Sequence, residues 1–383
     1  MAVVRLKRDW FVTSSSTTLV AINIKQSRTS EGSEEKDSDR ILAFTLSQSG
    51  KHAVLTDDHK RLVLFSTEPS WQCISTRWVV RRCTSLVFTQ AEDELYVADK
   101  SGDVYSFSVL EPQKPGELKL GHLSMLLDMT LSPDDKYIIT ADRDEKIRVS
   151  LRRAPYNIQA FCLGHREFVS SLLVPEQRPD WLLSGSGDGM VNVWHYETGK
   201  RLHSVDLRKL CPDSENTDVA KKFAVSRMVG SPDGHHVAVQ CERLPVIQLF
   251  LQGSGEEELL KSSETLALPL APWDIAFDSQ NRLWVILESQ EVNVLLYGFS
   301  EPHWKQCDPE SPDLKRVTDS LHTHWHLFTG SVGGESPFEH LYKVNFDNMA
   351  SYLQKKRERL ELESKKRAAA NSSKNRKKCK TES

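Results

Sequence analysis

A repeat with a period of just over 40 residues constrains this chain more than any other feature of its sequence. Four segments each contain an alternating apolar run, a turn, a second apolar run, an Asp-bearing turn and a third run. They occupy residues 41–65, 83–107, 121–150 and 164–194. Their last residues are Phe65, Phe107, Ser150 and Trp194, spaced 42, 43 and 44 apart. This period, with alternation inside each unit, is typical of the four-stranded blades of a β-propeller.

Three further units complete the predicted ring. Two looser copies cover residues 223–250 and 273–297, and the N-terminal strands should form a seventh blade by closing on strands near residues 316–329. We therefore predict an all-β fold, a seven-bladed WD40-type β-propeller over residues 1–335. A C-terminal strand and helix extension should follow over 336–370, with a disordered basic tail over 371–383.

Two of the segments carry the WD-repeat signature, in which a buried His, Asp, Ser or Thr and Trp form a hydrogen-bonded chain between strands. In 164–194 the matching residues are His165, Ser184, Asp188 and Trp194. In 121–150 they are His122, Thr140 and Asp144, with Ser150 in place of the Trp. We predict that these seven side chains are structural.

Charge is divided unevenly along the chain. Residues 355–380 hold twelve Lys or Arg and three Glu, a net charge of +9. Because the whole chain carries −3, the remainder carries −12. An acidic body repels phosphate backbones on average, whereas the basic segment attracts them.

The basic tail is open to three interpretations. Its two basic clusters and short spacer resemble a bipartite nuclear import signal. The same charges could contact RNA phosphates without reading bases, or they could serve only solubility. We favour import together with weak RNA contact, and the candidate residues are Lys365, Lys366, Arg367, Lys374, Arg376, Lys377 and Lys378.

Two patterns suggest chemistry but have simpler explanations. The glycine run 185–189 resembles an adenosylmethionine-binding loop, but such a loop opens a helix, and here an alternating strand follows. His322, His324 and His326 alternate, so a strand would place them on one face, where they could bind zinc. No second ligand cluster accompanies them, so we predict a polar strand face and no metal. No motif nominates a nucleophile or general base, and catalysis is not expected.

A charged group around one turn is a candidate for partner binding. Arg143, Glu145, Lys146 and Arg148 crowd the turn and strand after residue 142, and Lys100 lies at the equivalent turn one blade earlier. Exposed charges of both signs suit a partner chosen by charge complementarity, although solvated polar turns are also usual in WD repeats.

Several stretches resemble the non-catalytic WD-repeat subunits of eukaryotic tRNA (guanine-N(7)-)-methyltransferases. They are residues 55–65, 97–112, 121–150, 161–165 and 341–356. The resemblance implies a heterodimer in which a separate Rossmann-type subunit binds adenosylmethionine and methylates N(7) of a guanine in the tRNA variable loop. The propeller would stabilise that subunit and help bind tRNA, with no cofactor or catalytic residue of its own. The family's docking surface corresponds to Lys100, Arg143, Glu145, Lys146 and Arg148, and its location is the nucleus.

One alternative belongs to a different functional class, the substrate receptors of cullin ubiquitin ligases. That class often ends a blade with Trp-Asp-x-Arg, whereas here one blade ends Trp194-His195-Tyr196-Glu197 and another keeps only Arg153. No signal peptide or membrane span is expected, and the scattered cysteines fit a reducing compartment, the cytosol or nucleus.

Overall fold

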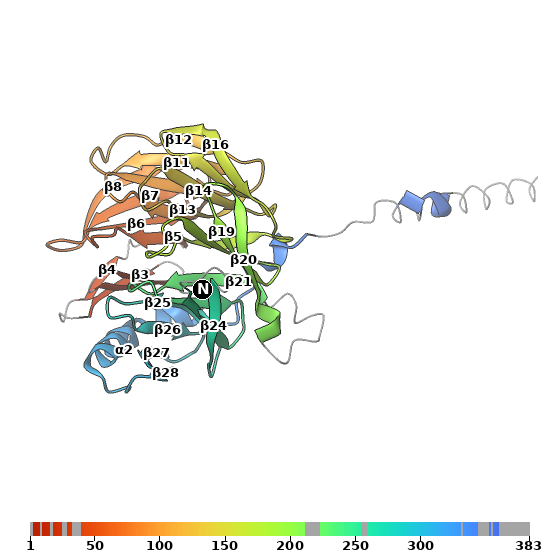
Figure 1. The fold of residues 1–383 in the computed structure, drawn as a ribbon. Helices are drawn as coiled ribbons and strands as arrows, with labels where there is room; N and C mark the ends of the chain where they lie inside the picture. The colour runs from red at the N-terminus through yellow and green to blue at the C-terminus, as the bar shows by residue number, and fades with distance from the viewer. Residues whose placement is uncertain are drawn as a thin grey trace, which may run out of the picture. The chain divides into compact units, whose positions relative to one another are not determined.

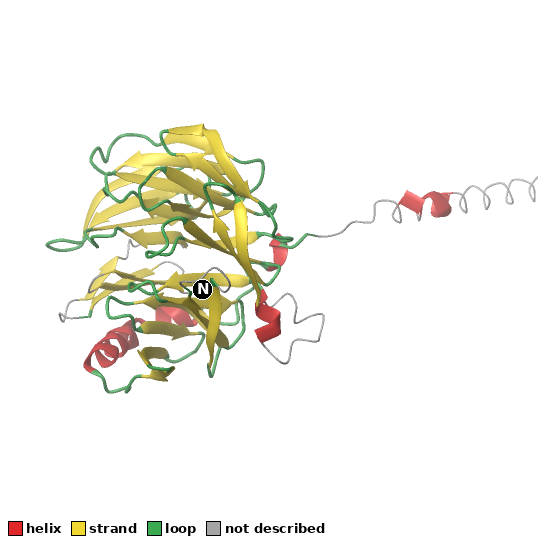
Figure 2. Cartoon of the chain, in the orientation of Figure 1, coloured by secondary structure: helices red, strands yellow, loops and turns green. Residues whose placement is uncertain are grey.

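A computed structural model describes most of the chain. The described residues are 3–7, 10–15, 18–24, 29–32, 40–210, 223–253, 259–330, 332–343, 352–353 and 355–359. They form seven four-stranded sheets, each a consecutive antiparallel meander, which confirms the predicted all-β seven-bladed propeller. Figure 1 shows the sheets in chain order, and Figure 2 shows how few helices accompany them.

The first four sheets come from the N-terminal half of the chain. The first contains β1 (Val3–Lys7), β2 (Trp10–Ser15), β3 (Thr18–Asn23) and β4 (Thr29–Gly32). The second contains β5 (Ile41–Leu46), β6 (His52–Asp57), β7 (Arg61–Ser66) and β8 (Gln72–Trp78). The third contains β9 (Cys83–Phe88), β10 (Glu94–Asp99), β11 (Asp103–Ser108) and β12 (Glu117–Gly121). The fourth contains β13 (Leu126–Leu131), β14 (Tyr137–Asp142), β15 (Ile147–Leu151) and β16 (Ala154–Cys162).

The remaining three sheets complete the ring. The fifth contains β17 (Val169–Leu173), β18 (Trp181–Ser186), β19 (Met190–His195) and β20 (Lys200–Asp206), followed by the short helix η1 (Leu207–Leu210). The sixth contains β21 (Val225–Gly230), β22 (His236–Cys241), β23 (Val246–Gln252) and β24 (Leu260–Ala267). The seventh contains β25 (Pro272–Phe277), β26 (Leu283–Leu287), β27 (Val294–Ser300) and β28 (His303–Gln306).

Burial within a sheet follows the position of the strand. The second strands β14 and β18 are buried at every residue, because neighbouring sheets cover both of their faces. The fourth strand β16 exposes most of its residues, since it forms the outer edge of its sheet. The core is therefore a series of apolar layers between adjacent sheets.

The prediction of which strands form the closing blade was wrong. The first sheet uses N-terminal strands only, and residues 316–329 are helical, in α2 (Pro312–His324) and α3 (His326–Thr329). Pro312 is at the start of α2, where its fixed φ suits a helix. Leu314, Val317 and Leu321 are spaced three and four apart and are buried against the first and last sheets. The expected strand face of His322, His324 and His326 therefore does not exist.

Side-chain contacts close the ring between the first and seventh sheets. Figure 1 shows β3 and β4 between the β5–β8 sheet and the β25–β28 sheet, in agreement with the contacts of β1 with β5 and β25. The buried Asp274 carboxylate accepts hydrogen bonds from the Val4 amide at 2.8 Å and the Arg5 guanidinium at 3.0 Å. Phe11 packs on Trp284 with ring centroids 5.4 Å apart.

The predicted C-terminal strand and helix extension is described only in part. The chain divides into a compact unit, Met1–Tyr342, and a second unit, Lys343–Ser383. Within 336–342 the structure contains the short helix η3 (Glu339–Leu341) in place of a strand. Residues 352–353 and 355–359 are helical, whereas the seven tail candidates lie outside the described residues. Among the described helices, none is long and apolar enough to cross a membrane.

Candidate macromolecular interface

One backbone hydrogen bond recurs in six of the seven sheets. The amide that follows the second strand donates to the carbonyl that precedes the first strand, at 2.8 to 3.0 Å. The pairs are Asp58 to Arg40, Lys100 to Arg82, Arg143 to Met125, Gly187 to Phe168, Glu242 to Ala224 and Glu288 to Ala271. This bond brings the turn between the second and third strands beside the loop that enters the sheet. We call the side of the propeller that carries these turns and loops the turn face.

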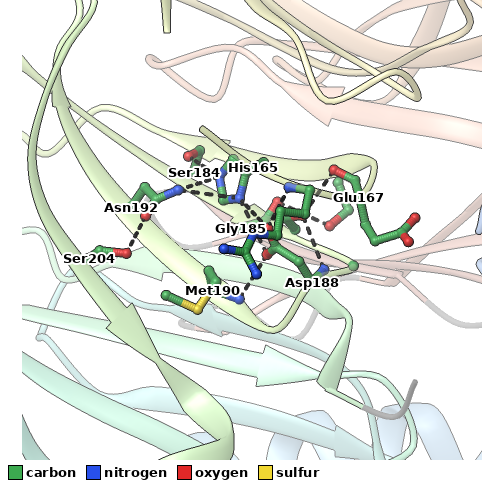
Figure 3. A network of polar contacts seen from close by, with 12 residues as sticks. His165, Glu167, Ser184, Gly185, Asp188, Met190, Asn192 and Ser204 are labelled. Carbon is green, nitrogen blue, oxygen red and sulfur yellow. Dashed lines mark hydrogen bonds and ion pairs between the residues drawn. The ribbon is translucent and has the colours of Figure 1, made fainter. Parts of the chain in front are cut away.

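Side chains strengthen the same junction in the β17–β20 sheet (Figure 3). The buried His165 ring lies 2.7 Å from the Ser184 hydroxyl and 3.1 Å from the Asp188 carboxylate, and the Trp194 indole N–H donates to Ser184 at 2.8 Å. Asp188 also accepts the Arg166 amide at 2.9 Å. Burial raises the pKa of Asp188, but the His165 and backbone hydrogen bonds outweigh it and bring this pKa below its usual value.

The glycine run 185–189 is part of this junction. A Cβ added to Gly187 would lie 2.4 Å from the Phe168 ring, and one added to Gly185 would lie 2.4 Å from Val225. Gly189 adopts φ +75°, which a side chain disfavours. Close packing between neighbouring elements thus accounts for these glycines.

The equivalent junction in the β13–β16 sheet corrects one prediction. His122 lies 2.8 Å from the Thr140 hydroxyl and 3.1 Å from the carboxylate of Asp142, not of Asp144. Asp144 is exposed. Asp142 ends β14 and also accepts the Lys146 amide at 2.9 Å, which fixes the turn.

The same capping Asp ends the second strand of two earlier sheets. Asp57 accepts the Arg61 amide at 2.9 Å, and Asp99 accepts the Asp103 amide at 3.2 Å. An Asp that ends the second strand in three successive repeats is the signal that could have identified Asp142.

Ser150, which replaces the signature Trp, accepts a hydrogen bond from Arg148. The Arg148 guanidinium donates to the Ser150 hydroxyl at 2.9 Å, to the Gly121 carbonyl at 3.0 Å and to the Pro155 carbonyl at 3.0 Å. It thereby joins the end of β12 to the start of β16. Burial lowers the pKa of this guanidinium. We call these three contacts the Arg148 clamp.

The other predicted partner residues lie on the turn face, but they differ in how exposed they are to a partner protein. Lys100 and Lys146 are exposed, and Glu145 is half-buried with φ 70°. The Arg143 guanidinium donates to the Leu341 and His340 carbonyls, both at 3.2 Å. Arg143 and Arg148 therefore bind carbonyls of this same chain, which the sequence could not reveal.

The structure adds a surface that the sequence did not suggest. Four apolar side chains are exposed on the outer strands β12 and β16, which contact each other across adjacent sheets. They are Leu118, Tyr156, Ile158 and Phe161, exposed by 56, 80, 44 and 41%. We call this group the apolar rim. Exposed apolar side chains on neighbouring strands are candidates for an interaction site when they form a contiguous patch.

Both signs of charge occur on both faces of the propeller, but basic side chains predominate on one part of the turn face. On the turn face of the second and third sheets, the basic side chains are Arg40, Lys60, Arg81, Arg82 and Lys100. We call these five residues the basic group. The β9–β10, β13–β14 and β17–β18 connections lie on the opposite face and carry an excess of acid, with Glu92, Asp93, Asp134, Asp135, Glu176 and Asp180. Within the described residues, no group of three or more His, Cys, Asp or Glu could hold a metal ion.

The family model that matches the chain is described as the tRNA methyltransferase TRM82 WD40 domain, and it covers residues 7–119 and 111–294. A curated protein of Danio rerio, the tRNA (guanine-N(7)-)-methyltransferase non-catalytic subunit wdr4, is 72% identical over all of this chain and 98% of its own length. The Homo sapiens subunit WDR4 is 47% identical over 86% of this chain and 80% of its own.

Solved structures resemble the chain in fold alone. A chain of the Mitotic Checkpoint Complex has a TM-score of 0.63 at 15% identity, covering 74% of this chain and 86% of its own. The Cps50 (Swd1) β-propeller domain of Myceliophteria_thermophila has a TM-score of 0.59 at 11% identity, covering 74 and 92%.

Replacing Asp142 and Asp144 one at a time by alanine tests which of the two carboxylates bonds His122 at this junction. Asp142→Ala should lower the free energy of unfolding by about 2–3 kcal/mol, because it leaves His122 and the Lys146 amide without their acceptor. The matched change Asp144→Ala, at an exposed site, should cost under about 0.5 kcal/mol. Urea unfolding followed by tryptophan fluorescence measures both. A larger loss from Asp144→Ala would restore the original assignment.

Proposed function

The chain belongs to the family of tRNA (guanine-N(7)-)-methyltransferase non-catalytic subunits, and we propose that it is the scaffold on which a separate catalytic subunit and tRNA are brought together. The observation that carries this proposal is the 72% identity, over the full length of the chain, to a subunit of that name. The names of its relatives support this function and not that of a cullin ubiquitin ligase receptor.

The proposal assigns the chemistry to the partner. The catalytic subunit binds adenosylmethionine and transfers the methyl group to N(7) of a guanine in the tRNA variable loop, and the propeller holds no cofactor. The described part of the propeller is consistent with this division, because its buried His, Asp and Ser side chains bond one another at sheet junctions. The nucleus is the proposed location, on the basis of the basic tail.

The catalytic subunit docks, in this proposal, where the apolar rim meets the turn face of the third and fourth sheets. Apolar contacts at the centre of an interface with charges around them are usual for stable protein pairs. Lys100 and Lys146 supply exposed charges there. Arg148 contributes indirectly, because its clamp holds β12 against β16 and so sets the relative position of Leu118 and Tyr156.

tRNA contacts the basic group beside this docking surface. Arg81 and Arg82 are exposed, and the Arg82 carbonyl is bonded to the Lys100 amide, so the group borders the partner surface directly. Lys and Arg that neutralise phosphates bind RNA without reading its sequence. The acidic connections on the opposite face disfavour RNA there and leave the turn face as the preferred side.

Copurification with methyl transfer is the decisive test of the scaffold function. The purified chain alone should transfer no methyl group from adenosylmethionine to tRNA, whereas its coexpressed complex with the family's catalytic subunit should be active. Each subunit assayed by itself is the control. The proposal fails if the two chains do not copurify, or if this chain alone binds adenosylmethionine.

The variant Arg148→Lys distinguishes the Arg148 clamp from a direct charge contact between Arg148 and the catalytic subunit. Lys keeps the charge but lacks the planar fork that reaches three acceptors, so association with the catalytic subunit should weaken about tenfold, as it should for Arg148→Glu. Tyr156→Ser, which leaves the clamp intact, should weaken association by a similar factor. The matched control is Leu110→Ser, also at an exposed leucine but on the β11–β12 connection. Calorimetric titration measures each variant, and normal binding by both Arg148→Lys and Tyr156→Ser would place docking elsewhere.

Charge reversal on the two faces tests the RNA surface. The double change Arg81→Glu and Arg82→Glu should lower the tRNA affinity of the complex about tenfold at low salt, with a smaller effect at high salt, because fewer counterions are released. The control pair Lys51→Glu and Lys136→Glu makes the same charge change on the opposite face. Fluorescence anisotropy measures both, and equal losses from the two pairs would contradict a specific RNA surface.

A further inference from the structure

Trp78 is a large aromatic residue that the fold leaves exposed on the turn face. It is the last residue of β8, the outer strand of the second sheet, and it is 68% exposed. The amide of the next residue, Val79, donates to the Lys60 carbonyl of the β6–β7 turn at 2.9 Å, which places Trp78 beside that turn. Within the described residues, the indole ring has no aromatic or cation–π contact.

The residues on either side hold the backbone of Trp78 in place. Arg77 is buried: its guanidinium donates to the Ser108 carbonyl at 2.7 Å and lies over the Phe107 ring, 5.1 Å from its centroid. Val79 is buried in the apolar layer between the second and third sheets. Because successive side chains of a strand point to opposite faces, Trp78 points away from that layer. The exposed ring is therefore carried by a fixed stretch of chain.

Another tryptophan of the same sheet shows what a structural role looks like. Trp71, in the β7–β8 connection, packs edge-on against Trp10 of the first sheet with ring centroids 5.6 Å apart, and its ring lies 6.1 Å from that of Phe65. Trp78 has no comparable neighbours among the described residues, and Val80, two residues later, is also 54% exposed. Packing of the propeller thus accounts for Trp71 but not for an indole at Trp78.

Arginines lie close to Trp78 on the turn face. Arg81 and Arg82 follow it by three and four residues and are both exposed, so even a fully extended chain keeps them within about 14 Å. Arg61 is opposite Trp78 in the pairing of β7 with β8. The Arg82 guanidinium donates to the Asp58 carbonyl at 3.4 Å, which keeps it at the same turn.

The two acids of this turn are already bonded within the chain. The Asp57 carboxylate accepts a hydrogen bond from the Arg61 guanidinium at 2.6 Å, and the Asp58 carboxylate accepts the Arg40 amide at 3.1 Å. The basic side chains at this junction outnumber them and are Arg40, Lys60, Arg61, Arg81 and Arg82. The charge around Trp78 therefore attracts phosphate groups.

We propose that Trp78 stacks on an unpaired base of bound tRNA while the basic group holds the neighbouring phosphates. This inference rests on the proposed function and names the RNA feature that its RNA surface binds. Proteins bind single-stranded RNA by this combination of an aromatic platform and flanking positive charges. The charge around Trp78 favours RNA over a protein partner, and the proposed docking surface for the catalytic subunit lies on the third and fourth sheets.

The contact gives the complex a way to distinguish folded tRNA from a plain duplex. Every base has a π-face, so stacking on Trp78 selects a base for being unpaired and accessible and does not read its identity. The loops of a tRNA offer such bases, whereas a base-paired stem does not. Phosphate contacts by Arg81 and Arg82 are made equally well to either, so they cannot make this distinction.

Substitutions of Trp78 in the complex with the catalytic subunit test the stacking contact. Trp78→Ser should lower tRNA affinity about tenfold, and Trp78→Phe, which keeps a flat ring, less than about threefold. Trp78→Leu is apolar but has no ring, so it should lose as much as Trp78→Ser. Phe299→Leu, which removes a part-exposed ring from β27, is the matched control. Fluorescence anisotropy measures each variant, and unchanged affinity with Trp78→Leu would show that no base stacks there.

Two further measurements separate stacking from charge. With a fully paired RNA duplex in place of tRNA, Trp78→Ser should change the affinity less than about twofold. The slope of log affinity against log salt for tRNA should be the same for Trp78→Ser as for the unaltered chain, because no phosphate contact is lost. Arg81→Glu with Arg82→Glu should make this slope shallower. An equal loss on the duplex, or a shallower slope for Trp78→Ser, would overturn the proposal.

Tryptophan fluorescence reports the contact without relying on a weakened variant. Addition of tRNA should quench the fluorescence of the unaltered complex more than that of the Trp78→Phe complex, because a base stacked on the indole quenches it. Equal quenching in the two complexes would contradict the stacking contact, even if Trp78→Ser or Trp78→Leu fails to fold.

The outcomes also separate this inference from the scaffold function. If Trp78→Ser weakens association with the catalytic subunit in calorimetric titration, Trp78 is a protein contact and the stacking proposal is wrong. If all Trp78 variants bind tRNA normally and the complex still methylates it, the stacking proposal fails and the scaffold function stands. If the unaltered chains do not form an active complex, both proposals fail.

Discussion

The backbone hydrogen bond from the amide after each second strand to the carbonyl before each first strand is the constraint on which the rest of this surface depends. It recurs in six sheets at 2.8 to 3.0 Å and requires no particular side chain. It therefore builds the turn face from main chain alone. The His122 and His165 junctions add side-chain bonds, and in the second sheet the Arg40 amide also donates to the Asp58 carboxylate. Because the backbone bond itself needs no particular side chain, binding residues can be placed at these turns without loss of the ring.

The fourth sheet shows how a departure from the repeat changes the surface. In the fifth sheet Trp194 fills the junction and bonds Ser184, whereas in the fourth sheet Ser150 takes the Trp position and accepts Arg148 instead. A guanidinium reaches further than an indole N–H, so it also bonds Gly121 in the neighbouring sheet. The outer strands β12 and β16 are thereby joined at the place where apolar side chains are exposed. The contacts of Arg148 thus replace those of the missing Trp, and they also hold together the two strands that carry the apolar rim.

The sequence predicts the sheets far better than it predicts the roles of single residues. The alternating pattern recurs along the chain, so a sheet can be recognised from its repeats even where one copy of the pattern is weak. Asp142 and Asp144 both suit a turn, and His122 bonds Asp142, the residue that matches Asp57 and Asp99 in the two earlier repeats. The alternating histidines indicate a strand where α2 forms, because the helical spacing of Leu314, Val317 and Leu321 competes with that alternation in the sequence. The carbonyl partners of Arg143 and Arg148 leave no trace in the sequence, since every residue has a carbonyl.

The body of the chain is acidic, which disfavours its proposed partner, RNA. The placement of the basic group on the turn face explains how RNA could nevertheless bind. A net charge describes the far field, whereas binding depends on the charges within about 10 Å of the phosphates. The acidic connections and the basic group lie on opposite faces, so in the proposed complex the average repulsion would also orient RNA toward Arg81 and Arg82. The fixed charges of the basic group therefore favour one side of the propeller, which in the proposed complex is where a docked catalytic subunit would meet its substrate.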